Sequence, residues 1–399
     1  MSVWDAVVGQ PEAVAELSAA AQAAATGGAG MTHSWLITGP AGSGRSIAAR
    51  AFAAALECRE WQERGSTMPG CGQCHSCLTV LDGSATDVSV HRTEGMQIRI
   101  GYAREMVVEA ASSPLASPWR VLIIEDADRL RESTGNVLLK ELEEPAERTV
   151  FVLCAPSVED VLPTIRSRCR VVRLRIPRAS DVAAVLEAEG IDTAIAAFAA
   201  RAAQGHIGRA RRLATDEESR RRRREVLELP IRLRSVGECL AAAADLVEAT
   251  AEEATTGNQD RDEAERTELV DVTTASGGRG KRGTIRMRGA AAALKELEAD
   301  QKRRNRRSQF DALDRALLDL AGWYRDVLAT QLEALSAGAV EPIHPDQSDT
   351  VARAARAWTP EQTLRRIDAI LDCRATMLEL NSIAPLLAIE ELALRLRAG

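Results

Sequence analysis

A glycine-rich loop between two apolar segments is the first place where this sequence could carry out chemistry. The segment Ser34–Thr38 predicts a short buried strand, and the alanine-rich run Ile47–Leu56 predicts a helix. Between them, Gly39–Ser46 has the glycine spacing of a P-loop, whose backbone N–H groups cradle phosphate at the N-terminus of the helix. The residues expected to contact a nucleotide or phosphate here are Gly39, Gly42, Gly44, Arg45 and Ser46.

This loop departs from a working P-loop ATPase in two ways. Arg45 stands where a lysine is expected, and a broad planar guanidinium does not replace a compact ammonium. The apolar run before Glu125 and Asp126 predicts a buried strand that delivers carboxylates to Mg²⁺, but the usual order is Asp then Glu. We therefore expect hydrolysis to be poor. The sequence leaves open whether the loop binds ATP, ADP or no nucleotide, and whether Mg²⁺ is bound.

Four cysteines after the predicted helix have the spacing of a metal site, C-x12-C-x2-C-x2-C: they are Cys58, Cys71, Cys74 and Cys77. Four thiolates at this spacing can close a tetrahedral structural Zn²⁺ site, which leaves no open position for catalysis. Two disulfides are the alternative, which we disfavour because a P-loop protein without a recognisable secretory signal belongs in a reducing compartment. His75 could replace one cysteine, but we expect it to point outward. We expect the other cysteines to be buried apolar residues: Cys154, Cys169, Cys239 and Cys373.

These candidate sites need a scaffold, and the hydrophobic pattern predicts an α/β domain followed by helices. Apolar segments alternate with helical ones, which predicts a parallel sheet with helices on both faces. The expected strands are Trp35–Thr38, Val88–Val90, Val121–Ile124, Val150–Leu153 and Val171–Leu174. This nucleotide-binding-type domain, with its zinc module (58–77), is expected over 1–176. Helices expected from Asp181 to Gly205 and again after Gly205 suggest a helical lid over 177–229.

The remainder, 230–399, predicts an all-α domain. Its apolar residues recur at helical spacing between Phe310 and Leu328 and between Thr363 and Leu396. One such stripe consists of Leu313, Leu317, Leu320, Tyr324 and Leu328. An interruption at about 250–288 has few apolar residues, so it cannot bury enough surface to offset the entropy of ordering. We therefore expect a disordered insertion there.

Composition limits the classes of protein that this chain can be. Its 399 residues suffice for two or three domains, and no long uncharged apolar run predicts a membrane-spanning helix. The formal net charge of −7 argues against a protein whose whole surface binds DNA. Two basic runs, Arg220–Arg224 and Lys302–Arg307, could touch DNA, but such runs on helices are more often solvated faces.

Several motifs together point to one family. They are Val8-Gly9-Gln10, Thr32–Leu36, the P-loop, the four cysteines after it, Glu125–Asp128, Asn136–Pro145 and Ile165-Arg-Ser-Arg-Cys169. With these motifs the chain resembles the delta-prime subunits of bacterial DNA polymerase III clamp loaders, which are members of the AAA+ superfamily. The resemblance covers roughly residues 1–215 with specific motifs, and the rest of the chain only by its helical character.

The resemblance implies several roles. In that family, the arginine of the Ser-Arg-Cys motif is an arginine finger: it contacts ATP bound by the adjacent motor subunit. Arg168 is therefore the expected arginine finger in trans. The alternative is that Arg168 forms an ordinary surface ion pair. Arg209, near the start of a lid helix, is the candidate nucleotide sensor, and a plain lid-surface arginine is the alternative. His206 is expected to be a turn residue.

The resemblance also implies partners and a compartment. The expected partners are the motor (gamma/tau) and delta subunits, which a helical collar would join to this chain. The sliding clamp is a further expected partner, and primed DNA would be bound through the assembled complex. The expected compartment is the cytoplasm. A gamma/tau-type motor that hydrolyses ATP is the alternative, against which Arg45 and the Glu125-Asp126 order count. A zinc-dependent nucleic-acid-binding protein is a third interpretation. It would need a basic, aromatic surface near the cysteines, where the sequence offers little.

Overall fold

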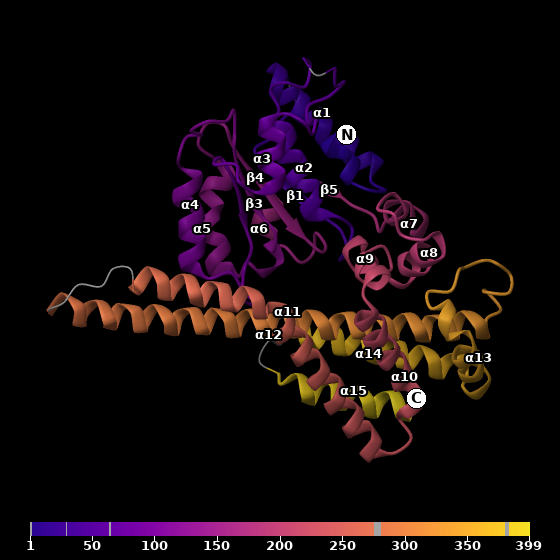
Figure 1. Cartoon of the computed structure of the whole chain (residues 1–399). Coiled ribbons are helices and arrows are strands. Elements are labelled where there is room, and N and C mark those ends of the chain that lie inside the picture. The colour runs from indigo at the N-terminus through magenta and orange to yellow at the C-terminus, as the bar shows by residue number, and fades with distance from the viewer. Residues whose placement is uncertain (1, 29, 64, 275–280, 380–382) are drawn as a thin grey trace. The chain divides into compact units, whose positions relative to one another are not determined.

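A computed structural model describes residues 2–28, 30–63, 65–274, 281–379 and 383–399 (Figure 1). The chain forms two compact units. The first consists of Met1–Thr93 with Gln97–Thr215, and the second of Glu94–Met96 with Asp216–Gly399. Among the described residues, no helix is both long enough and apolar enough to cross a membrane.

The first unit contains a parallel five-stranded sheet in the order β2-β3-β4-β1-β5. The strands are β1 (Ser34–Thr38), β2 (Val88–His91), β3 (Arg120–Ile124), β4 (Thr149–Ala155) and β5 (Arg170–Arg173). Every residue of β1, β3 and β4 is buried, as expected for parallel strands covered on both sides. All five strands predicted from the sequence are confirmed.

Helices cover both faces of this sheet (Figure 1). The helices α1 (Pro11–Thr26), α2 (Arg45–Glu57) and α3 (His75–Asp82) share one core with the alternate strand residues Ile37 and Val152. On the opposite face, α4 (Ile100–Ala110), α5 (Glu132–Glu143) and the short α6 (Pro163–Arg166) pack against Leu36 and Phe151. Two short 3-10 turns, η1 (Val3–Ala6) and η2 (Ala127–Arg129), complete this part. The expected α/β architecture is confirmed.

Three helices end the first unit: α7 (Ala179–Ala188), α8 (Thr193–Ala202) and α9 (Ile207–Thr215). They have a small core of their own, with Val182, Leu186 and Leu213 at its centre. The side chain of Asp192 accepts hydrogen bonds from the backbone N–H groups of Ala194 and Ile195, which caps the N-terminus of α8.

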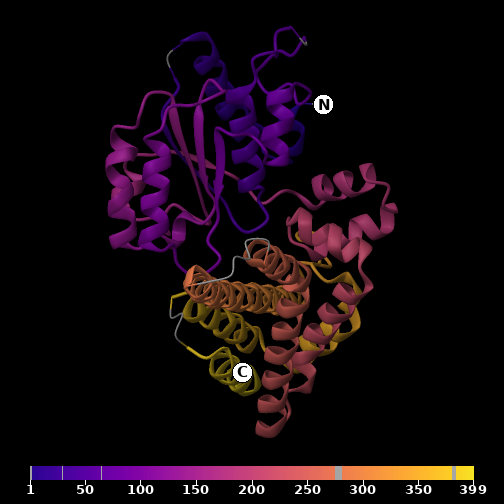
Figure 2. The ribbon, with the colours of Figure 1, turned by 60° about the vertical axis from the view of Figure 1, so that its left-hand side comes forward.

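The second unit is helical (Figure 2). Its elements are α10 (Glu217–Arg232), α11 (Val236–Thr274), α12 (Lys281–Gln331), η3 (Pro345–Gln347), α13 (Ser348–Ala357), α14 (Pro360–Glu379) and α15 (Pro385–Ala398). Leu313, Leu317, Leu320 and Tyr324 of the predicted stripe are buried in its core. Leu227 and Leu229 of α10 lie in the same core. Helix α10 therefore packs with the C-terminal helices, although the sequence placed most of it in the lid.

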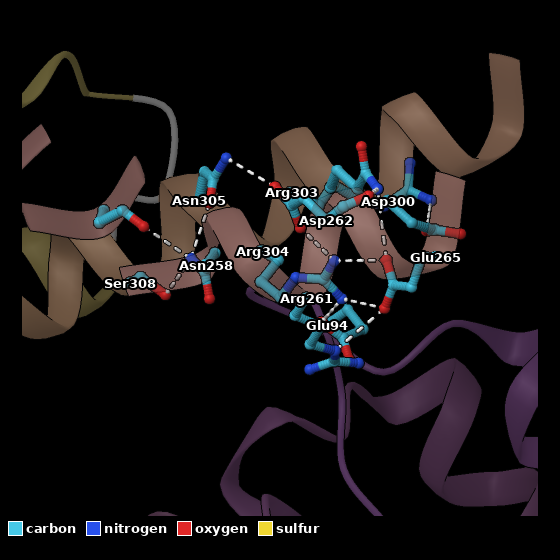
Figure 3. A network of polar contacts seen from close by, with 12 residues as sticks. Glu94, Asn258, Arg261, Asp262, Glu265, Asp300, Arg303, Arg304, Asn305 and Ser308 are labelled. Carbon is cyan, nitrogen blue, oxygen red and sulfur yellow. Dashed lines mark hydrogen bonds and ion pairs between the residues drawn. The ribbon is translucent and has the colours of Figure 1, made fainter. Parts of the chain in front are cut away.

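The structure differs most from the sequence-based expectation at the disordered insertion predicted for 250–288. Helix α11 continues through this region to Thr274, and α12 begins at Lys281; residues 275–280 lie outside the described residues. Polar side chains pair between the two helices (Figure 3). Arg304 of α12 forms ion pairs with Asp262 and, at 2.6 Å, with Glu265 of α11. Such pairing offsets part of the entropy lost when the two helices become ordered. The expectation of disorder considered only the scarcity of apolar residues and not these ion pairs.

Candidate functional site

The glycine loop joins β1 to α2 at the carboxyl edge of the sheet, as predicted. Gly42 and Gly44 both have left-handed backbones, with φ values of +85° and +92°, which the loop needs to turn into the helix. The buried Gln10 side chain braces the loop by donating to the carbonyl oxygens of Ser43 (3.2 Å) and Arg175 (2.6 Å). The loop is therefore held from outside by the chain that precedes α1.

Arg45 does not extend outward from this loop. Its Nη1 atom donates a hydrogen bond to the carbonyl oxygen of Gly39, six residues earlier in sequence. The guanidinium thus closes back on the loop that should present it to a phosphate. Arg45 is the first of several site residues whose side chains bond to other groups of the same chain.

His206 lies against the same loop. A Cβ atom added at Gly42 would lie 2.5 Å from Cα and 2.7 Å from Cγ of His206, so only glycine fits at this position. The backbone N–H of Arg209 donates to His206 Nδ1 at 3.3 Å, which fixes the imidazole at the first turn of α9. His206, expected from the sequence to be merely a turn residue, therefore contacts the P-loop directly. Arg209 itself is largely buried in α9.

Glu125 and Asp126 follow β3 at the same edge of the sheet, and both carboxylates have partners within the chain. Glu125 forms ion pairs with Arg50 at 3.5 Å and with Arg92 at 3.8 Å. Asp126 accepts a hydrogen bond from the backbone N–H of Thr93 at 3.3 Å and pairs with Arg129 at 3.7 Å. Both carboxylates are thus engaged by cations or N–H donors of the chain itself, which would have to give way before either carboxylate could bind Mg²⁺.

The four predicted cysteines form a candidate metal centre. The Sγ atoms of Cys58, Cys71, Cys74 and Cys77 all lie within 4.8 Å of one another, and all four residues are buried free thiols. The disulfide alternative is therefore not realised in the structure. His75 is exposed and lies outside the cluster, as expected.

Local backbone structure places the sulfurs. Cys58 is the C-cap of α2 and Cys74 the N-cap of α3, while Gly70 and Gly72 turn the intervening chain with φ values of +97° and +71°. Backbone N–H groups donate to three of the sulfurs at 3.4 Å: from Cys71 to Cys58, from Cys74 to Cys71, and from Cys77 to Cys74. Donors of this kind stabilise thiolates, so the donor set fits a thiophilic ion such as Zn²⁺.

The remaining cysteines behave largely as the sequence indicated. Cys154, Cys239 and Cys373 are buried, whereas Cys169 is only half-buried. Burial raises the pKa of Cys154 to about 12, so this thiol stays protonated although it lies near the phosphate loop.

Arg168 lies between α6 and β5, with 31% of its side chain exposed. Its Nε atom donates to Glu143 Oε1 at 2.5 Å, and Nη2 contacts the same oxygen. Its Nη1 atom donates to the carbonyl oxygen of Thr164 at 2.7 Å. Arg168 thus forms the surface ion pair, with Glu143, that is the alternative to an arginine finger. The Arg168 side chain is nevertheless partly exposed.

Both basic runs contain structural arginines. Arg223 is buried, where it forms an ion pair with Asp346 at 2.9 Å and contacts His344 Nδ1. Arg304 is buried between carboxylates of α11, as described above. Neither run is therefore a continuous free cationic face for DNA.

Comparison with known proteins places the first part of the chain. Residues 9–178 match the family model described as DNA polymerase III, delta subunit. The matched stretch is a little under half of the chain. The match includes the glycine loop, the four clustered cysteines, the acids after β3 and Arg168.

Curated relatives carry two different subunit names. DNA polymerase III subunit gamma/tau of Mycobacterium tuberculosis (strain H37Rv) is 32% identical over 206 residues, which are 50% of this chain and 34% of that protein. DNA polymerase III subunit delta' of Pseudomonas aeruginosa is 33% identical over 139 residues, 34% of this chain and 41% of that protein. The chain thus spans 34% to 41% of the length of these relatives. A solved gamma-subunit-related protein of Thermotoga maritima is 16% identical, with a TM-score of 0.37 over 91% of this chain and 93% of that one.

Proposed function

We propose that this chain is a clamp-loader subunit of DNA polymerase III, of the non-motor, delta-prime type. It would complete the ring of AAA+ subunits that opens the sliding clamp and places it on primed DNA. One observation carries the choice of a non-motor subunit: the groups that a P-loop ATPase uses for turnover are paired internally. Arg45 bonds to Gly39, and Glu125 pairs with Arg50 and Arg92.

In this proposal Arg168 acts on ATP held by a neighbouring subunit. A guanidinium can donate two parallel hydrogen bonds to phosphate oxygens, and its charge stabilises the transferring phosphoryl group. An arginine finger of this kind contributes about 10³-fold or more to the rate. Because the side chain is partly exposed, it is accessible to such a partner.

We further propose that the four-cysteine centre holds one structural Zn²⁺. The ion would cross-link the end of α2 to the start of α3, and it would have no open position for a substrate. Cys58, Cys71, Cys74 and Cys77 would be its ligands.

A gamma/tau-type motor is the second candidate, because the gamma/tau relative matches a longer stretch of the chain, 206 residues against 139 for delta'. The two candidates differ in what the isolated chain does with ATP. The non-motor type predicts turnover far below about 1 s⁻¹, at the low end of ordinary enzymes. Turnover above that rate, abolished by Arg45→Ala, would establish the motor type instead.

The finger is tested in complexes rebuilt with the motor subunits, the clamp and primed DNA. Arg168→Ala should assemble normally, as judged by size, yet slow ATP turnover at the adjoining site by about 10³-fold. Arg168→Lys should restore little, because an ammonium lacks the planar fork. Arg166→Ala removes the same charge two residues away and serves as the matched control. Equal turnover by the parent and Arg168→Ala complexes would refute the finger.

A further inference from the structure

Each nitrogen of the Arg168 guanidinium has an acceptor within its own unit. Nε and Nη2 contact the Glu143 carboxylate at the end of α5, while Nη1 donates to the Thr164 carbonyl oxygen and to Ser167 Oγ at 3.3 Å. Before the guanidinium could form a bidentate contact with a phosphate, it would have to release at least some of these partners.

Without a partner, Glu143 would occupy an electrostatically unfavourable position. It is the last residue of α5, where the partial negative charge of the helix C-terminus disfavours a carboxylate. Arg168 offsets that charge through its direct contact. The carboxylate and the guanidinium thus compensate each other across two elements.

The Arg168–Glu143 ion pair is also one that a phosphate could displace. About half of the Glu143 side chain is exposed, and solvent-exposed ion pairs contribute little to stability. A triphosphate presents more charge and more acceptor oxygens than one carboxylate, so it can compete for the same guanidinium.

We propose that Glu143 is a positioning residue that holds Arg168 in reserve and releases it to the neighbouring subunit's bound triphosphate. This inference rests on the proposed role of Arg168 in trans. The pair would keep the guanidinium ordered at the surface of the unassembled chain, and breaking it would be part of the free energy of engaging the neighbouring site.

The test uses the same rebuilt complexes. Glu143→Gln keeps the shape of the side chain and removes its charge, so Arg168 is released more easily and DNA-stimulated ATP turnover should rise by about twofold to fivefold. The rise should shrink as salt increases, because the parent pair is then already screened. Glu144→Gln removes the same charge at the next residue and should change turnover little. Glu143→Ala provides a second variant, and thermal unfolding of each chain verifies its fold.

The same variants made in the Arg168→Ala background complete a double-mutant cycle, in which Glu143→Gln should have no effect. Unchanged or lower turnover with Glu143→Gln, an equal rise with Glu144→Gln, or a rise that persists without Arg168 would each overturn the positioning role. If Arg168→Ala itself leaves turnover unchanged, the role in trans fails as well. If Arg168→Ala slows turnover and Glu143→Gln does nothing, the positioning role alone fails.

Discussion

At the scale of single residues, the phosphate loop depends on glycines for two separable reasons. Gly42 and Gly44 both need left-handed backbones, but only Gly42 also faces a neighbour, His206. A Cβ at Gly44 would meet nothing within 4 Å. The two positions therefore distinguish backbone strain from crowding.

We expect Gly44→Ala to cost about 1 kcal/mol of unfolding free energy from left-handed strain alone. Gly42→Ala should cost about 1–3 kcal/mol more, because the lid must move away from the loop. Calorimetry of both variants measures the difference. Equal costs would mean that His206 does not lie against the loop in solution.

The site was predictable from the sequence only in part. The glycine loop, the acids after β3 and the cysteines were found because each motif is local and its spacing is diagnostic. The partners of the loop and of the acids were not found: Arg50, Arg92 and His206 reach them through the fold, from positions that no short motif links to them.

At the scale of elements, the same reasoning explains one success and one failure. Buried parallel strands such as β3 and β4 are continuous apolar runs, which a sequence displays directly. The α11 and α12 pair was missed because its stabilising contacts join residues such as Asp262 and Arg304, far apart in the chain. Amino-acid composition shows that the segment is highly charged, but it does not show which charged residues form ion pairs.

Removing Arg304 should destabilise the second unit strongly. Its side chain is only 7% exposed, and its loss would leave the carboxylates of Asp262 and Glu265 without their shared cation. We expect Arg304→Ala to cost about 3 kcal/mol of unfolding free energy. Arg303→Ala is the matched control: it breaks a more exposed pair with Asp300 on the same helix and should cost less than about 1 kcal/mol. Similar losses in both variants would contradict a structural role for Arg304.

The same cluster predicts how stability responds to acid. Hydrogen bonding from Arg304 lowers the pKa of Glu265 to about 2, below its unfolded value of about 4.3. Its contribution to stability is therefore present above about pH 4.3 and is lost as the pH falls toward 2. The difference in melting temperature between the parent and Glu265→Gln should shrink over that range. A difference that stays constant between pH 5 and pH 2.5 would show that the carboxylate does not pair with Arg304.

Deleting 250–288 is accordingly no neutral change. It would remove Asp262 and Glu265 and leave Arg304 buried without them. A disordered insertion could have been removed without cost, whereas this helical pair cannot.

At the scale of the whole molecule, the chain has separate cores in its two units, and the four-cysteine candidate metal centre belongs to the first. Chelation of bound metal should therefore lower the unfolding temperature of the first unit and leave that of the second unchanged. Calorimetry with and without a strong chelator checks this, with metal analysis expected to give one Zn²⁺ per chain. Cys74→Ser should reproduce the effect of the chelator. Metal-free protein with unshifted transitions would refute a structural ion.

The four-cysteine candidate metal centre also packs into the core of the first unit. Trp4 Nε1 donates to the carbonyl oxygen of Pro69 at 2.9 Å, and the sulfurs share one core with Trp4 and with α2, the helix that follows the phosphate loop. Cys58 ends that helix. If the proposed ion is bound, a thiol oxidant that displaces it should loosen more than the cysteine loop. Amide hydrogens along α2 should exchange faster, together with those of the N-terminal turn. Oxidative damage to the cysteines would thus reach the phosphate loop through the helix that connects them.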